Sequence, residues 1–258
     1  DVPAARDAGP KAFVTVQRGC DYKCTFCIVP TTRGPERSRR LADVVREVEV
    51  LAGSGVSEVT LLGQTVNSYH DGESDFAALL RAVGAVDGIR RLRFTSPYPT
   101  DFTPAVIAAM AETPAVCEHV HLPVQSGSDA VLRRMLRRYT RERYLEVVQQ
   151  LRDAIPGMTI STDIIVGFPG ETEEQFAETV SLVGEAGFDD AYTFRYSPRD
   201  GTPATRLKDH VPDDVSADRL DRLIGVGRAQ SRRKNHERAG TVHEVLAEQP
   251  AKPAGMLA

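Results

Sequence analysis

The chain has 258 residues, of which 41% are hydrophobic and 26% charged, and its formal net charge is −4 at pH 7. These values fit a globular protein of one large α/β domain and argue against a protein that coats nucleic acid generally. No apolar run approaches the roughly 20 residues that span a bilayer, and no signal peptide is evident, so we expect a cytoplasmic protein without a membrane partner.

Six apolar runs predict strands, and patterns of helical spacing follow them. The predicted strands cover residues 12–16, 56–62, 90–95, 120–124, 158–166 and 191–196. Predicted helices begin near residues 41, 76, 103, 128, 141 and 172, and the last of them starts with a capping box of Thr172 and Gln175. This alternation favours a parallel sheet with crossover helices, which allows a doubly wound sheet or a barrel.

The chain divides into four predicted parts. Residues 1–10 form a linker remnant, 11–215 the α/β core, 216–238 a basic helix, and 239–258 a tail with a strand-like run at 241–246. Two segments are basic: residues 131–143 carry six arginines against one glutamate, and residues 219–238 carry seven Lys/Arg against two acids. Either patch fits phosphate contacts, and a solvated helix face explains it equally well.

Three cysteines follow the first predicted strand with the spacing C-x3-C-x2-C: Cys20, Cys24 and Cys27. Three thiolates can hold three irons of a cubane 4Fe–4S cluster and leave one iron open for a small molecule. A zinc site is the alternative, but zinc needs four closed ligands and no histidine lies within forty residues downstream of Cys27. A disulfide would leave one cysteine over. Only Cys117 remains elsewhere, and we interpret it as a buried thiol.

The cysteine spacing, with Phe26 just before the last cysteine, resembles the radical S-adenosylmethionine (SAM) superfamily. The resemblance implies a partial (β/α)6 barrel of the TIM type, a SAM molecule chelated by the open iron, and reductive cleavage of SAM to a 5′-deoxyadenosyl radical. Active residues of such barrels lie at the carboxyl ends of the strands.

Five segments at strand ends narrow the resemblance to the methylthiotransferases. They are residues 61–69, 95–99, 117–128, 163–172 and 194–204. The runs 63–67 and 28–34 look most like the group that acts on isopentenyl-adenosine next to the tRNA anticodon. The alternatives are methylthiotransferases of a ribosomal-protein aspartate or of threonylcarbamoyl-adenosine tRNA, and a non-catalytic fragment that binds RNA or a partner.

The resemblance also implies the residues of the site. The cluster ligands are Cys20, Cys24 and Cys27, and the expected SAM contacts are Phe26, Gln64, Gln125, Ser126, Arg137, Asp163 and Arg195. Arg137 would pair with the SAM carboxylate, because a guanidinium matches carboxylate geometry. Arg195 lies opposite Phe194 along its strand, and we expect it inside the barrel end.

Other residues of these segments have structural interpretations. Gly167, Pro169 and Gly170 are expected to shape their loop. His119 and His121 share a face of one strand, where hydrogen-bonded histidines are favoured over a metal site.

The resemblance also implies domains that this chain lacks or contains only in part. It implies an N-terminal domain with a second 4Fe–4S cluster, and an RNA-binding TRAM domain of which residues 239–258 would be only a truncated start. The implied partners are the tRNA anticodon stem-loop and an electron donor such as flavodoxin or ferredoxin, with the chain as a monomer. We therefore expect a fragment that cleaves SAM and lacks the sulfur-donating half of methylthiolation.

Overall fold

The computed structural model describes residues 9–248. The strands are β1 (Lys11–Thr15), β2 (Gln17–Arg18), β3 (Arg37–Ser38), β4 (Glu58–Leu62), β5 (Arg91–Phe94), β6 (His119–His121), β7 (Thr159–Val166) and β8 (Asp190–Arg195). The helices are α1 (Val29–Arg33), α2 (Leu41–Gly53), α3 (Phe76–Gly84), α4 (Pro104–Glu112), α5 (Asp129–Arg134), α6 (Arg141–Ala154), α7 (Glu173–Ala186) and α8 (Asp213–Glu237). Three short 3-10 helices complete the set: η1 (Val66–Ser68), η2 (Pro99–Asp101) and η3 (Pro203–Arg206).

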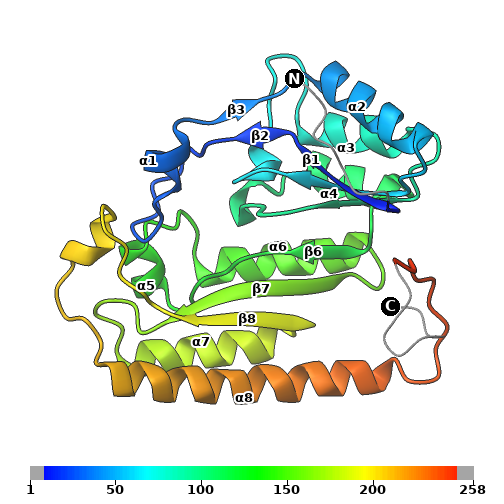
Figure 1. The fold of residues 1–258 in the computed structure, drawn as a ribbon. Helices are drawn as coiled ribbons and strands as arrows, with labels where there is room; N and C mark the ends of the chain where they lie inside the picture. The colour runs from blue at the N-terminus through cyan, green and yellow to red at the C-terminus, as the bar shows by residue number, and fades with distance from the viewer. Residues whose placement is uncertain (1–8, 249–258) are drawn as a thin grey trace.

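Six parallel strands form the central layer in the order of the chain. One sheet runs β1-β4-β5, a second runs β6-β7-β8, and an isolated parallel bridge between Leu92 and Val116 joins them. Figure 1 shows a curved layer with β1 and β8 apart. Within the described residues β1 and β8 do not pair. The predicted partial (β/α)6 barrel is therefore confirmed.

Alternation along the strands separates the two faces of this layer. On β7, Ile160, Ile164 and Val166 are fully buried, whereas Ser161 and Asp163 lie on the opposite, polar face. The register pairs Asp163 with Tyr192 and Ile165 with Phe194, so the aromatic rings of β8 share the polar, concave face. Both rings are about half exposed, which is expected at the open edge of a partial barrel.

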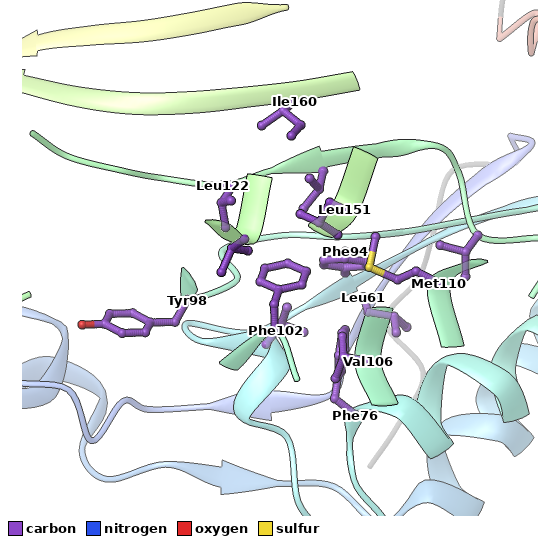
Figure 2. Packing of buried hydrophobic residues seen from close by; sticks show 14 of the residues in the cluster. Leu61, Phe76, Phe94, Tyr98, Phe102, Val106, Met110, Leu122, Leu151 and Ile160 are labelled. Atoms are coloured by element: carbon purple, nitrogen blue, oxygen red, sulfur yellow. The ribbon is translucent and has the colours of Figure 1, made fainter. Parts of the chain in front are cut away.

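The main hydrophobic core lies between the strands and the surrounding helices. Phe76 of α3 meets Phe94 of β5 edge to face, with ring centroids 5.2 Å apart. Figure 2 shows Phe102 and Leu151 in the same cluster, and Tyr98 at its margin with its hydroxyl turned away from the other labelled side chains. Tyr98 thus joins the core to the polar edge of the barrel.

Helix α8 packs against β8 and α7, as Figure 1 shows. Its Arg219 forms a buried ion pair with Glu171, with 3.0 Å between Nη1 and Oε2. Lys234 and Arg238 both pair with Asp189, next to β8. Part of the basic character of this helix therefore serves to hold it on the core.

The tail after α8 contains no strand within residues 241–248, so the strand expected at 241–246 is absent. The tail is held by charges instead: Glu244 pairs with Arg90 at 2.5 Å, and Glu248 pairs with Lys11. The rest of the predicted tail, residues 249–258, lies outside the described residues, as do residues 1–8. Among the residues described, no helix has the length and apolar character to cross a membrane.

Candidate active site

The three cysteines lie on the loop between β2 and α1. All three are free thiols; Cys24 is buried, and Cys20 and Cys27 are half-buried. Burial raises the pKa of the Cys27 thiol, and the nearby Cys24 and Cys20 add to this effect. The two-stranded ladder of β2 and β3 closes this loop at its base.

Gly19 opens the cysteine loop in a conformation that requires glycine. Its φ is +80°, and a Cβ there would lie 2.0 Å from the Pro35 carbonyl oxygen. The Gly19 amide donates to Gln64 Oε1 at 2.7 Å, and the Cys20 thiol lies 3.3 Å from the Thr65 hydroxyl. Gln64, one of the expected SAM contacts, therefore anchors the loop with its acceptor atom.

The turn after α5 holds the middle of the loop. The Thr25 amide donates to the Met135 carbonyl at 3.0 Å, and its hydroxyl donates to the Arg134 carbonyl at 2.9 Å. The Ala204 amide donates in turn to the Thr25 carbonyl at 2.9 Å. Two parts of the chain that are distant in sequence from this loop, residues 134–135 and Ala204, therefore fix the short run between Cys24 and Cys27.

Arg137 reaches the cysteine loop from the same turn. Its Nη1 lies 3.5 Å from Cys24 Sγ, and its Nε donates to the Tyr139 hydroxyl at 2.8 Å. The guanidinium carbon lies 4.4 Å from the ring centroid of Tyr98. Among the expected SAM contacts, Arg137 is thus placed directly beside a cysteine.

A chain of polar side chains from β6 and β7 lines the concave face. Asp163 Oδ2 lies 3.2 Å from His121 Nε2, and His121 Nδ1 lies 2.9 Å from Ser161 Oγ. Ser161 Oγ also lies 3.3 Å from His119 Nε2. Burial, with the nearby positive charge of Arg93, lowers the pKa of His119. No group of three or more His, Cys, Asp or Glu side chains within residues 9–248 is arranged to hold a single metal ion.

The remaining expected contacts are scattered over several environments. Phe26 is half-buried and meets Phe168 edge to face, with 6.4 Å between centroids. Gln125 is buried with a φ of +70° and bridges to Ile164 of β7. Ser126 is fully buried, 3.3 Å from the Thr179 hydroxyl of α7.

Arg195 differs from its predicted place. It is exposed and aligns with Val166, on the face that Ala191 shares on the same strand. Ala191 lies against Gly227 of α8, so this face is the outer one. The expectation that Arg195 points into the barrel is therefore wrong, because Tyr192 and Phe194 occupy the concave face.

Two residues of the site were not assigned from the sequence. Tyr22 and Tyr98 stack with centroids 3.9 Å apart and 21° between ring planes, and they connect the cysteine loop with η2. The Tyr22 hydroxyl donates to Asp101 at 2.8 Å. Tyr98 lies in the 95–99 segment at the end of a predicted strand, but a ring stack between residues 76 positions apart leaves no local sequence pattern.

A partial barrel of parallel strands with three free cysteines on the loop after its first strands defines a radical SAM domain. The chain belongs to the Radical SAM superfamily, whose family model matches residues 14–183. The superfamily uses a 4Fe–4S cluster and SAM, so the predicted class of cofactors is confirmed.

Curated proteins of similar sequence indicate a narrower group within the superfamily. It is 54% identical over 248 residues to the tRNA-2-methylthio-N(6)-dimethylallyladenosine synthase of Acidothermus cellulolyticus, covering 95% of this chain and 50% of the relative. It is 51% identical to the enzyme of that name from Deinococcus radiodurans (99% of this chain, 52% of the relative) and 52% identical to that of Thermus thermophilus (99% and 56%). The chain thus spans about half the length of the curated relatives it matches.

Solved structures agree on the fold. The radical SAM methyltransferase TsrM from Kitasatospora setae superimposes with a TM-score of 0.64 at 22% identity, covering 76% of this chain and 38% of TsrM. Coproporphyrinogen III oxidase (HemN) from Escherichia coli gives a TM-score of 0.64 at 18% identity, covering 86% and 53%.

Proposed function

We propose that this chain is the SAM-cleaving core of a methylthiotransferase that modifies isopentenyl-adenosine next to the tRNA anticodon. The observation that carries the proposal is the loop with three free cysteines at the carboxyl edge of the barrel, fixed by hydrogen bonds with Gln64, just after β4, and with the turn after α5. The tRNA substrate is inferred from the curated relatives, which are named for that reaction.

The cysteine loop fits a 4Fe–4S cluster. It offers three free thiols on one short loop, and Cys117, the fourth cysteine, lies elsewhere, near Arg91 and Arg93. Cys20, Cys24 and Cys27 would hold three irons and leave one open. A cluster bound there supplies the electron that cleaves SAM to methionine and the 5′-deoxyadenosyl radical.

The chain's own residues would bind and orient SAM beside that cluster. Asp163 has its orientation fixed by His121 on the concave face, and Phe26 offers a half-buried ring beside the last cysteine. Gln125 is presented by a positive φ at the carboxyl side of β6. Arg137 retains N–H groups beyond its protein contacts for a carboxylate.

Gln64 would reach SAM through its amide nitrogen, since its oxygen is used by Gly19. We leave Ser126 and Arg195 outside the proposed SAM site. The Ser126 hydroxyl is buried against α7, and Arg195 lies on the face of α8.

Helix α8 is the surface that we propose for contact with tRNA. Arg219, Arg222, Lys234 and Arg238 are engaged in ion pairs with the core or with their own helix. Arg228 and Arg232 line a groove of about 500 Å³ between α8 and β8. Two cations in one groove suit the phosphates of an RNA loop.

The remaining inferences follow from the same function. A one-electron donor such as flavodoxin or ferredoxin would reduce the cluster of a monomeric cytoplasmic protein. Sulfur donation would need the second cluster of an N-terminal domain, which the greater length of the relatives accommodates. This chain alone would then cleave SAM without completing methylthiolation.

Competition binding tests the choice of substrate. A labelled anticodon stem-loop with isopentenyl-adenosine is bound to the chain and challenged with unlabelled stem-loop or with a ribosomal-protein peptide that contains the target aspartate. We expect the stem-loop alone to compete. Displacement by the peptide would favour the aspartate-modifying alternative. If this chain alone formed thiomethylated tRNA, the proposal that sulfur donation needs a further domain would be refuted.

A further inference from the structure

The guanidinium of Arg137 is held on several sides by protein groups. Nε donates to the Tyr139 hydroxyl at 2.8 Å, and Nη2 donates to the Pro123 carbonyl at 3.2 Å. The rings of Tyr98 and Tyr139 lie 4.4 Å and 5.1 Å from its central carbon. These contacts aim the remaining nitrogen, Nη1, at Cys24 Sγ at 3.5 Å.

The groups around Arg137 are themselves fixed. Tyr98 forms two backbone hydrogen bonds with the side chain of the buried Asn67. The Tyr98 amide donates to Asn67 Oδ1 at 2.7 Å, and the Tyr98 carbonyl accepts from Asn67 Nδ2 at 2.9 Å. The Tyr98 hydroxyl accepts from the Arg138 amide at 2.8 Å. The Tyr139 hydroxyl donates to the Val124 carbonyl at 2.9 Å. Arg137 is thus pre-organised, with few alternative rotamers to lose.

Within residues 9–248, Arg137 makes no direct ion pair with a carboxylate. Asp101, whose charge it senses, is hydrogen-bonded to Tyr22 instead. A half-buried guanidinium is costly unless an anion balances it. The Cys24 sulfur is the acceptor at Nη1, and it becomes anionic when it binds iron as a thiolate.

We propose that Arg137 is a positioning residue for the cluster: it donates a charge-assisted N–H···S bond to the Cys24 thiolate and makes the bound cluster easier to reduce. This inference rests on the proposed function. One-electron reduction adds a negative charge to the cluster, so a fixed cation at one of its sulfur ligands favours the reduced form. The role is distinct from binding a SAM carboxylate, because it acts in the absence of SAM.

The test compares three variants of the full chain, each reconstituted anaerobically with iron and sulfide. Arg137→Gln removes the charge, Arg137→Lys keeps it without the fork geometry, and Arg133→Gln, at an exposed arginine of α5, is the control for loss of a positive charge. The readout is the midpoint potential of the cluster, from a dithionite titration followed by electron paramagnetic resonance without SAM. Iron is counted in every sample.

We expect Arg137→Gln to lower the ratio of reduced to oxidised cluster at a fixed potential by about tenfold, which is a shift of about 59 mV for one electron. Arg137→Lys should shift less, and Arg133→Gln should match the unaltered chain. A folded Arg137→Gln chain that binds no iron, while Arg137→Lys binds it, would equally support the positioning role.

An unchanged midpoint potential in Arg137→Gln with a full iron count would overturn the inference. If SAM affinity alone fell in that variant, Arg137 would be a carboxylate ligand only. If the unaltered chain bound no cluster, the proposed function itself would fail, so the two failures are distinguishable.

Discussion

Gly19 lies so close to Pro35 that a Cβ on Gly19 would sit 2.0 Å from the Pro35 carbonyl oxygen. Gly19 also donates its amide to Gln64 at the end of β4, so its place fixes the entry into the cysteine loop. The backbone contact is to a carbonyl, which cannot move aside as a flexible side chain would.

Gly19→Ala should therefore displace the cysteine loop and lower iron incorporation severalfold. Gly34→Ala is the matched control, because Gly34 also has a positive φ of +74° but nothing within 4 Å of the added methyl group. The control should cost only backbone strain of about 1–3 kcal/mol. Iron per chain and thermal unfolding measure both effects, and equal iron loss in the two variants would contradict the proposed clash.

The buried ion pair of α8 should dominate its docking energy. Arg219→Met leaves Glu171 buried without its cation and should cost about 3–5 kcal/mol of unfolding free energy. Arg222→Ala, which breaks the more exposed pair with Glu173, should cost about 1 kcal/mol or less. Denaturant unfolding measures both free energies. Similar losses in the two variants would show that the buried pair stabilises the fold no more than the exposed pair does.

Asp189 should make the docking of α8 sensitive to acid. Burial opposes its charge, but the Ile160 amide and the cations of Lys234 and Arg238 outweigh burial and lower its pKa. A lowered pKa means that the stabilisation is present above the unfolded value of about 3.8 and is lost as the pH falls through the folded pKa.

Asp189→Asn should cost roughly 1.5–3 kcal/mol at pH 7, and its difference from the unaltered chain should shrink as the pH falls below about 4. Asp190→Asn, at the exposed neighbouring residue, is the control and should change little. Unfolding curves from pH 7 to acid pH measure the difference in unfolding free energy between the variant and the unaltered chain. A difference that does not change with pH would show that Asp189 is not the cause of the acid sensitivity.

RNA binding should depend on the two arginines of the groove. Arg228→Gln with Arg232→Gln should lower the slope of log affinity against log salt by about 1 per arginine for an anticodon stem-loop. Arg233→Gln is the control on the same helix, since Arg233 faces Glu237 at 3.9 Å and does not line the groove. An equal effect of the control would indicate non-specific attraction to the helix.

Regular periodicity made the core elements predictable. The helix expected at 141–154 has those bounds, and the capping box of Thr172 and Gln175 begins α7. α1 and the β2–β3 ladder were missed, because elements of two to five residues carry no period and depend on the loop that they enclose.

The site was predictable as far as local spacing allowed. Cysteine spacing identified the loop, but the stack of Tyr22 on Tyr98 and the reach of Arg137 to Cys24 are tertiary contacts. Strand alternation correctly set Arg195 opposite Phe194, yet it could not say which face was concave. At the open edge of the barrel the aromatic residues face inward while half exposed, which reverses the usual inference from hydrophobicity.

The most direct test of the central claim is anaerobic reconstitution of the chain with iron and sulfide, followed by reduction, addition of SAM and assay of 5′-deoxyadenosine. The account predicts about four irons per chain and 5′-deoxyadenosine formation, both lost when Cys20, Cys24 and Cys27 are replaced by alanine. Zinc in place of iron, or a reduced cluster that leaves SAM intact, would contradict it.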